Sequence, residues 1–63
     1  MRKEYTIITI LENGKTLEPI TRKTEKGMSD YANRMFSKYG ENITVEVYCE
    51  NSLGMYLFRT YHA

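Results

Sequence analysis

The sequence lacks the groups that usually cross-link small domains. Its 63 residues include one cysteine, Cys49, and one histidine, His62. One cysteine excludes an internal disulfide, and these two side chains cannot supply the four ligands of a tetrahedral metal site. A chain this short buries only about 60% of the surface that its unfolded form exposes. Association with another chain is the remaining source of stability, which predicts a homodimer or a permanent protein partner.

Strong net charge and long apolar runs are also missing. A net charge of +1 gives little attraction to nucleic acid or to a membrane surface. No apolar run approaches the ~20 residues of a membrane span, and residues 1–5 lack the apolar core of a signal peptide. We therefore expect a single domain over residues 1–63 without membrane contact, in the cytoplasm (of the host cell if the protein is viral).

Residues 43–61 predict an antiparallel β-hairpin. Apolar and polar residues alternate from Ile43 to Glu50, and residues 55–61 are rich in side chains that suit a pleated surface. A loop at residues 51–54 gives the facing pairs Cys49–Tyr56, Val47–Phe58, Val45–Thr60, Tyr48–Leu57, Glu46–Arg59 and Thr44–Tyr61. We favour this register because it places the opposite charges of Glu46 and Arg59 across from each other.

Both faces of this predicted hairpin are apolar. One face carries Ile43, Val45, Val47, Cys49, Tyr56 and Phe58, and it requires a cover. The other carries Tyr48, Met55, Leu57 and Tyr61 among Thr44, Glu46 and Arg59. Because the second face is too apolar for an ordinary solvent-facing surface, it predicts an interaction site.

Residues 3–11 contain five consecutive β-branched residues, at positions 6–10, and predict a central strand because both of its faces are apolar. Either the set Tyr5, Ile7 and Leu11 or the set Ile8 and Ile10 then shares the exposed face with the hairpin. The dipeptide Asn13-Gly14 predicts a type I′ turn. A returning strand over residues 16–22 contains Pro19, which places it at a sheet edge or at a bulge.

Residues 24–40 predict a helix, with Thr24 as its N-cap and Gly40 as its stop. Its apolar stripe is formed by Met28, Tyr31, Ala32, Met35, Phe36 and Tyr39. Gly27 in the first turn favours a start nearer Met28. The predicted fold is α+β, a ββαββ arrangement in which one amphipathic helix covers one face of a four-stranded antiparallel sheet.

No group of residues predicts catalysis or a cofactor. Gly14-Lys15-Thr16 lacks the earlier glycine of a phosphate-binding loop. His62 lies at the tail and Cys49 on the predicted core face, so no nucleophile and base come together. Three basic residues, Arg22, Lys23 and Lys26, gather at the helix start and form a weak candidate anion site. The alternative is a solvated basic turn, which we favour.

The strongest candidate site is a protein contact face comprising Tyr5, Tyr48, Met55, Leu57, Arg59 and Tyr61. Tyrosine suits positions that remain half-buried at a contact surface. We therefore expect a non-enzymatic protein-binding module that docks on a larger protein or self-associates. Accessory regulators and inhibitors of this size are common in phages and mobile elements, and we expect such a role. The alternative function is single-stranded nucleic-acid binding, with sheet aromatics stacking on bases and basic residues meeting phosphates.

Overall fold

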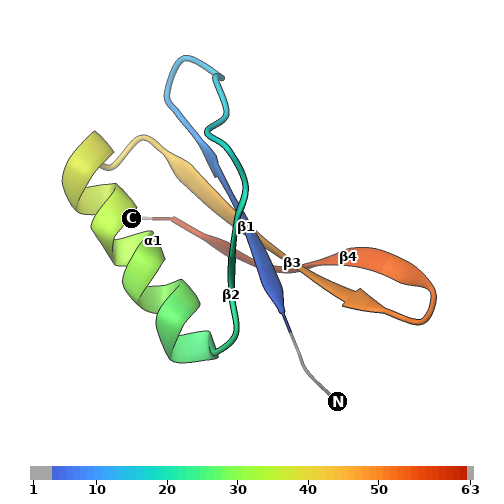
Figure 1. Cartoon of the computed structure of the whole chain (residues 1–63). Helices are drawn as coiled ribbons and strands as arrows, with labels where there is room; N and C mark the ends of the chain where they lie inside the picture. The colour runs from blue at the N-terminus through green and yellow to red at the C-terminus, as the bar shows by residue number, and fades with distance from the viewer. Residues whose placement is uncertain (1–3, 63) are drawn as a thin grey trace.

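The computed structural model describes residues 4–62 and contains one helix and a four-stranded sheet (Figure 1). The elements are β1 (Tyr5–Ile10), β2 (Ile20–Arg22), α1 (Glu25–Tyr39), β3 (Thr44–Asn51) and β4 (Gly54–Tyr61). The strands are antiparallel throughout and lie in the order β2-β1-β3-β4. The predicted α+β fold and its ββαββ order are confirmed, and β1 is a central strand as expected. The first residue of the predicted strand, Lys3, lies outside the described part.

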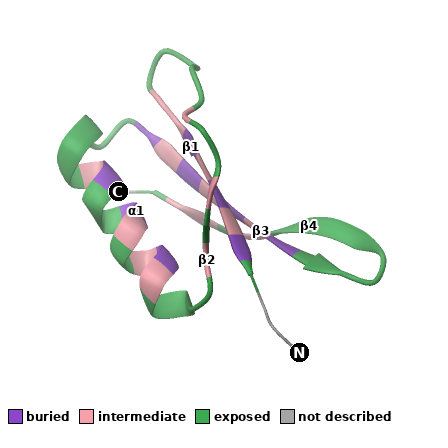
Figure 2. Ribbon diagram, in the orientation of Figure 1, coloured by how far each residue is buried: buried purple, intermediate pink, exposed green. Residues whose placement is uncertain are grey.

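The core lies between α1 and one face of the sheet. β1 presents alternate residues to the helix, beginning with Tyr5 and Ile7, because side chains point to opposite faces along a strand. The other core residues are Met28, Ala32, Met35, Ile43, Val45, Val47 and Cys49. The helix covers the β1–β2 side, and Figure 2 shows that the buried residues lie on β1, β3 and α1.

The Thr24 side chain caps the N-terminus of α1 and sets where the helix begins. Thr24 has extended backbone angles, and its Oγ1 accepts a hydrogen bond from the Gly27 N–H at 3.0 Å. A Cβ on Gly27 would lie 3.0 Å from that same oxygen, so the glycine leaves room for the cap. The expected shift of the start toward Met28 is therefore wrong, and α1 begins at Glu25. Gly40 ends it with a φ of 95°.

The first connection is a different turn from the one predicted. Gly14 has a φ of 87°, but Asn13 does not have a positive φ, so the turn is not type I′. Instead Gly14 N–H donates to the Leu11 carbonyl at 2.9 Å, and the Asn13 side chain accepts from Lys15 N–H at 2.9 Å. This is a type I turn followed by a left-handed glycine, the usual solution for a three-residue hairpin loop.

The strand after this turn is interrupted. It touches β1 at an isolated bridge between Ile10 and Thr16 and resumes only at Ile20 as β2. Pro19 has no N–H to donate, and its place beside the edge strand agrees with the prediction. One edge of the sheet is therefore short and broken, whereas the other edge is the eight-residue strand β4.

The hairpin of β3 and β4 follows the predicted register near its loop and departs from it beyond a bulge. Cys49 faces Tyr56 and Tyr48 faces Leu57, as expected. The register then shifts between Tyr48 and Val47, with Phe58 as the extra residue on β4. The resulting pairs are Val47–Arg59, Glu46–Thr60 and Val45–Tyr61, so the predicted pairs Val47–Phe58, Glu46–Arg59, Val45–Thr60 and Thr44–Tyr61 are wrong.

Candidate functional site

The sheet face that points away from α1 has no covering element among residues 4–62. Its side chains come from alternate positions of three strands and surround a central carboxylate. We call this surface the open face, and it comprises Thr6, Ile8, Ile10, Thr44, Glu46, Tyr48, Glu50, Met55, Leu57 and Thr60. Glu50, near the hairpin turn, is exposed, and the other six members on β1 and β3 are half-buried by lateral packing in the sheet.

Four aliphatic side chains form the apolar part of the open face. Ile8 and Ile10 complete it from β1, which resolves the two alternatives left by the sequence in favour of this set. Met55 and Leu57 continue it on β4, with 55% and 50% of their surface exposed. The two pairs lie on either side of β3, with Glu46 and Tyr48 between them. Apolar side chains gathered on one uncovered face of a small domain are characteristic of an interaction surface.

Glu46 lies at the middle of the open face. It is paired with Ile8 on one side and with Thr60 on the other, while Thr44 and Tyr48 precede and follow it on the same face of β3. The Tyr48 hydroxyl donates a hydrogen bond to Glu46 Oε1 at 3.1 Å. Because the donor is neutral, this contact satisfies one lone pair and leaves the negative charge in place.

The same hydrogen bond affects the tyrosine. Donation to the Glu46 carboxylate raises the pKa of Tyr48 above its usual 10.0, and partial desolvation and the negative charge of Glu46 act in the same direction. Tyr48 therefore stays protonated throughout the physiological range. The Tyr48 hydroxyl and the Glu46 carboxylate are hydrogen-bonded polar groups that lie between the apolar side chains of β1 and β4.

Three of the six predicted contact residues lie elsewhere. Tyr5 is 4% exposed and its ring packs against Phe58 with centroids 5.3 Å apart, so its assignment to the contact face is wrong. Tyr61 packs against the core and faces Val45. The bulge at Phe58 moves Arg59 to the helix side as well. Tyr48, Met55 and Leu57 are on the open face as predicted.

Arg59 has a structural role on the covered side. Its Nη2 lies 3.7 Å from Glu25 Oε1 at the start of α1, and its Nη1 donates to the Tyr61 hydroxyl at 3.3 Å. The guanidinium also lies 5.2 Å from the Phe58 ring centroid and 5.9 Å from that of Tyr61. The bond to Tyr61 and the nearby charge of Glu25 raise the pKa of Arg59. The arginine therefore connects β4 to the helix and is absent from the open face.

The sequence contained one signal for this difference. Phe58 and Tyr61 are the bulky aromatics in the second half of β4, and they are three residues apart. Period-two alternation places such residues on opposite faces, so both can pack on the core only if the strand contains an extra residue. Ile8 and Ile10 were also outside the six predicted residues, because the strand pattern left the choice between its two faces open.

The end of the hairpin projects beyond the rest of the sheet (Figure 1). Tyr5 pairs with Cys49, and no residue of β1 extends past this pair toward the loop. Leu53 at the turn is 95% exposed and Tyr56 is 43% exposed, although Tyr56 belongs to the helix side. Gly54, with a φ of 125°, allows the turn. The projecting end therefore exposes apolar side chains on both faces of the hairpin, Met55 and Leu57 on the open face and Tyr56 on the other.

The basic cluster at the start of α1 is largely engaged. Arg22 donates to the Thr21 carbonyl at 2.9 Å and stacks over the Tyr31 ring at 5.3 Å. Lys26 forms an ion pair with Asp30 at 3.0 Å. Lys23 is exposed. The three side chains do not converge on a common point through any of these contacts, so the cluster has the features of a solvated basic turn.

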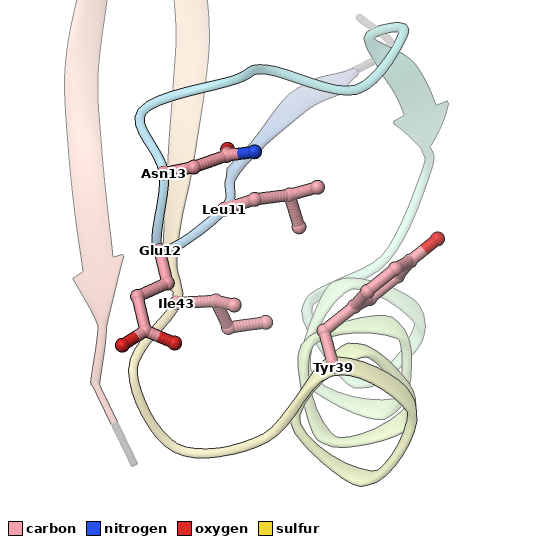
Figure 3. A pocket seen from close by; sticks show the side chains of 5 residues that line it. All are labelled: Leu11, Glu12, Asn13, Tyr39 and Ile43. Carbon is pink, nitrogen blue, oxygen red and sulfur yellow. The ribbon is translucent and has the colours of Figure 1, made fainter.

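A hollow lies between the β1–β2 connection and the last turn of α1 (Figure 3). It is lined by Leu11, Glu12, Asn13, Tyr39 and Ile43. It is open to solvent, and the Glu12 carboxylate at its rim accepts a hydrogen bond from Asn42 Nδ2 at 3.4 Å. A ligand pocket normally encloses its ligand and directs several polar groups toward it. This hollow does neither.

The remaining reactive side chains are dispersed. Cys49 is buried in the core and His62 is exposed after β4, in accordance with their expected places. Within residues 4–62, no three His, Cys, Asp or Glu side chains are grouped so that they could hold a metal ion. The one helix in this range is also too short and too polar to cross a membrane.

The chain shows no significant match to any protein-family model, curated protein or solved structure with which it was compared.

Proposed function

We propose that this protein is a non-enzymatic protein-binding module that docks on a larger protein through its open face. The observation that carries the proposal is the exposed apolar surface opposite α1, formed by Ile8, Ile10, Met55 and Leu57 beside Tyr48. A chain this short has a small free energy of unfolding. Uncovered apolar area of this kind lowers solubility, which favours a function that buries it.

The alternative of single-stranded nucleic-acid binding has less support. A stacking platform requires several exposed aromatic rings beside basic groups. Tyr5 and Tyr61 pack on the covered side, and Arg59 reaches toward Glu25 there. Tyr48 is left beside the Glu46 carboxylate, which repels phosphates.

The test is capture of a partner by the immobilised chain, followed by titration with that partner in purified form. The matched variants are Met55→Lys with Leu57→Lys on the open face, and Asn33→Lys with Ser37→Lys on the exposed side of α1. Both pairs add two positive charges at exposed positions, so circular dichroism should show an intact fold for each. We expect the first pair to abolish binding and the second to leave it unchanged. Equal binding by both pairs would place the contact elsewhere on the molecule.

A further inference from the structure

We propose that the partner places a cationic side chain, best an arginine, against Glu46 at the centre of the open face. This inference rests on the proposed function and specifies the chemistry of the docking partner. Glu46 is half-buried, and its neighbours across the sheet are Ile8 and Thr60. Any molecule that covers the surrounding apolar residues must also cover this carboxylate.

An unpaired carboxylate makes such a contact unfavourable. Burial of a charge without a counter-charge is strongly unfavourable, because the charge loses its hydration. The hydrogen bond from the Tyr48 hydroxyl supplies a dipole but no positive charge. The ion pairs of residues 4–62 are Lys26–Asp30 and Arg59–Glu25, and neither involves Glu46. The bulge at Phe58 holds the one basic residue of β4 on the other side of the sheet. Within this part of the chain, neither carboxylate of the open face, the central Glu46 or the peripheral Glu50, has a counter-charge.

The same charge argues against a second copy as the occupant. A two-fold dimer buries the same patch of both subunits, so a dimer through this face brings two Glu46 carboxylates together near its axis. Like charges opposed at an interface repel each other and weaken the association. A partner whose apolar surface contains a cation can instead cover the apolar residues and neutralise Glu46. A guanidinium suits the site best, because it can pair with Glu46 and stack on the adjacent Tyr48 ring.

The experiment uses variants of the chain itself as probes, with self-association measured by sedimentation equilibrium. Wild type should remain monomeric. The variant Glu46→Gln should self-associate, because it keeps the apolar face and loses the opposed charges. An equimolar mixture of wild type and Glu46→Arg should associate at least about tenfold more tightly than Glu46→Gln alone, since a close charge pair couples by at least about 1.5 kcal/mol. The gain should shrink between about 0.1 M and about 1 M salt.

The matched control is Glu50, an exposed residue at the hairpin end of the open face that faces Met55, because a Glu50→Arg variant keeps the central Glu46. A mixture of wild type and Glu50→Arg should associate no better than wild type alone. Wild type that dimerises as well as Glu46→Gln would overturn the inference, as would a mixture with Glu46→Arg that is no tighter than Glu46→Gln alone. If neither Glu46→Gln nor the mixture associates, the open face does not drive contacts at all and the proposed function also fails.

Discussion

Thr9 provides the sharpest test of how the core is arranged. It is 1% exposed between α1 and the sheet, and its Oγ1 is buried without a hydrogen-bond partner among the described residues. A buried polar group left unsatisfied costs about 1–3 kcal/mol. Valine has the same branched shape and replaces the hydroxyl with a methyl group. We therefore expect Thr9→Val to raise the free energy of unfolding by about 1–2 kcal/mol, the lower part of that range.

The assay is urea denaturation followed by circular dichroism. Thr9→Val should move the midpoint to higher urea with an unchanged slope, because the surface exposed on unfolding is almost the same. For a domain of this size, a gain of 1 kcal/mol corresponds to a rise in Tm of about 4–8 °C. The variant Thr9→Ser tests the contribution of the methyl group alone, since it keeps the hydroxyl and removes the methyl. It should lower stability by about 0.8 kcal/mol or more.

The control is Thr44→Val, which makes the same substitution on the half-buried open face. It should change stability by no more than about 0.5 kcal/mol. If Thr9→Val is no more stable than wild type, the hydroxyl has a partner in solution and the reasoning about the core is refuted.

Two further predictions concern local contacts. Thr24→Ala removes the acceptor of the Gly27 N–H and should lower the free energy of unfolding by about 1 kcal/mol in the same urea assay, whereas Thr24→Ser, which keeps the acceptor, should restore most of it. A loss of less than a few tenths of a kcal/mol would show that the cap does not hold the helix start. Glu46→Gln should lower the pKa of Tyr48 toward 10.0, because the carboxylate that favours the protonated hydroxyl is gone. The measurement is an NMR titration of the Tyr48 ring against wild type, at a concentration at which both proteins are monomeric. Since the raised pKa belongs to the folded state, the stability from this bond is present below pH 10.0 and is lost as the pH rises through the folded value. An unchanged Tyr48 titration in Glu46→Gln would show that the hydrogen bond does not form in solution.

The choice of contact residues shows where sequence reasoning stops. Tyr5 was assigned to the exposed face because both faces of its strand are apolar, and nothing local distinguishes them. The structure decides by placing Tyr5 beside Phe58 and beneath the cover of α1. Arg59 was assigned by a plausible charge pair with Glu46. A nearby carboxylate on the helix, Glu25, takes that role once the bulge is present.

The local patterns of the sequence determined the elements of this protein. A run of β-branched residues specified β1, and period-two alternation specified β3. The 3.6-residue stripe between Thr24 and Gly40 specified α1, and Pro19 marked the edge strand, because each signal depends on a few neighbouring residues. Tertiary structure alone decided the strand order, the face of β1 that meets the helix and the bulge at Phe58. Each of these depends on which distant surfaces pack together. One extra residue in a strand moves every later side chain to the opposite face of the sheet.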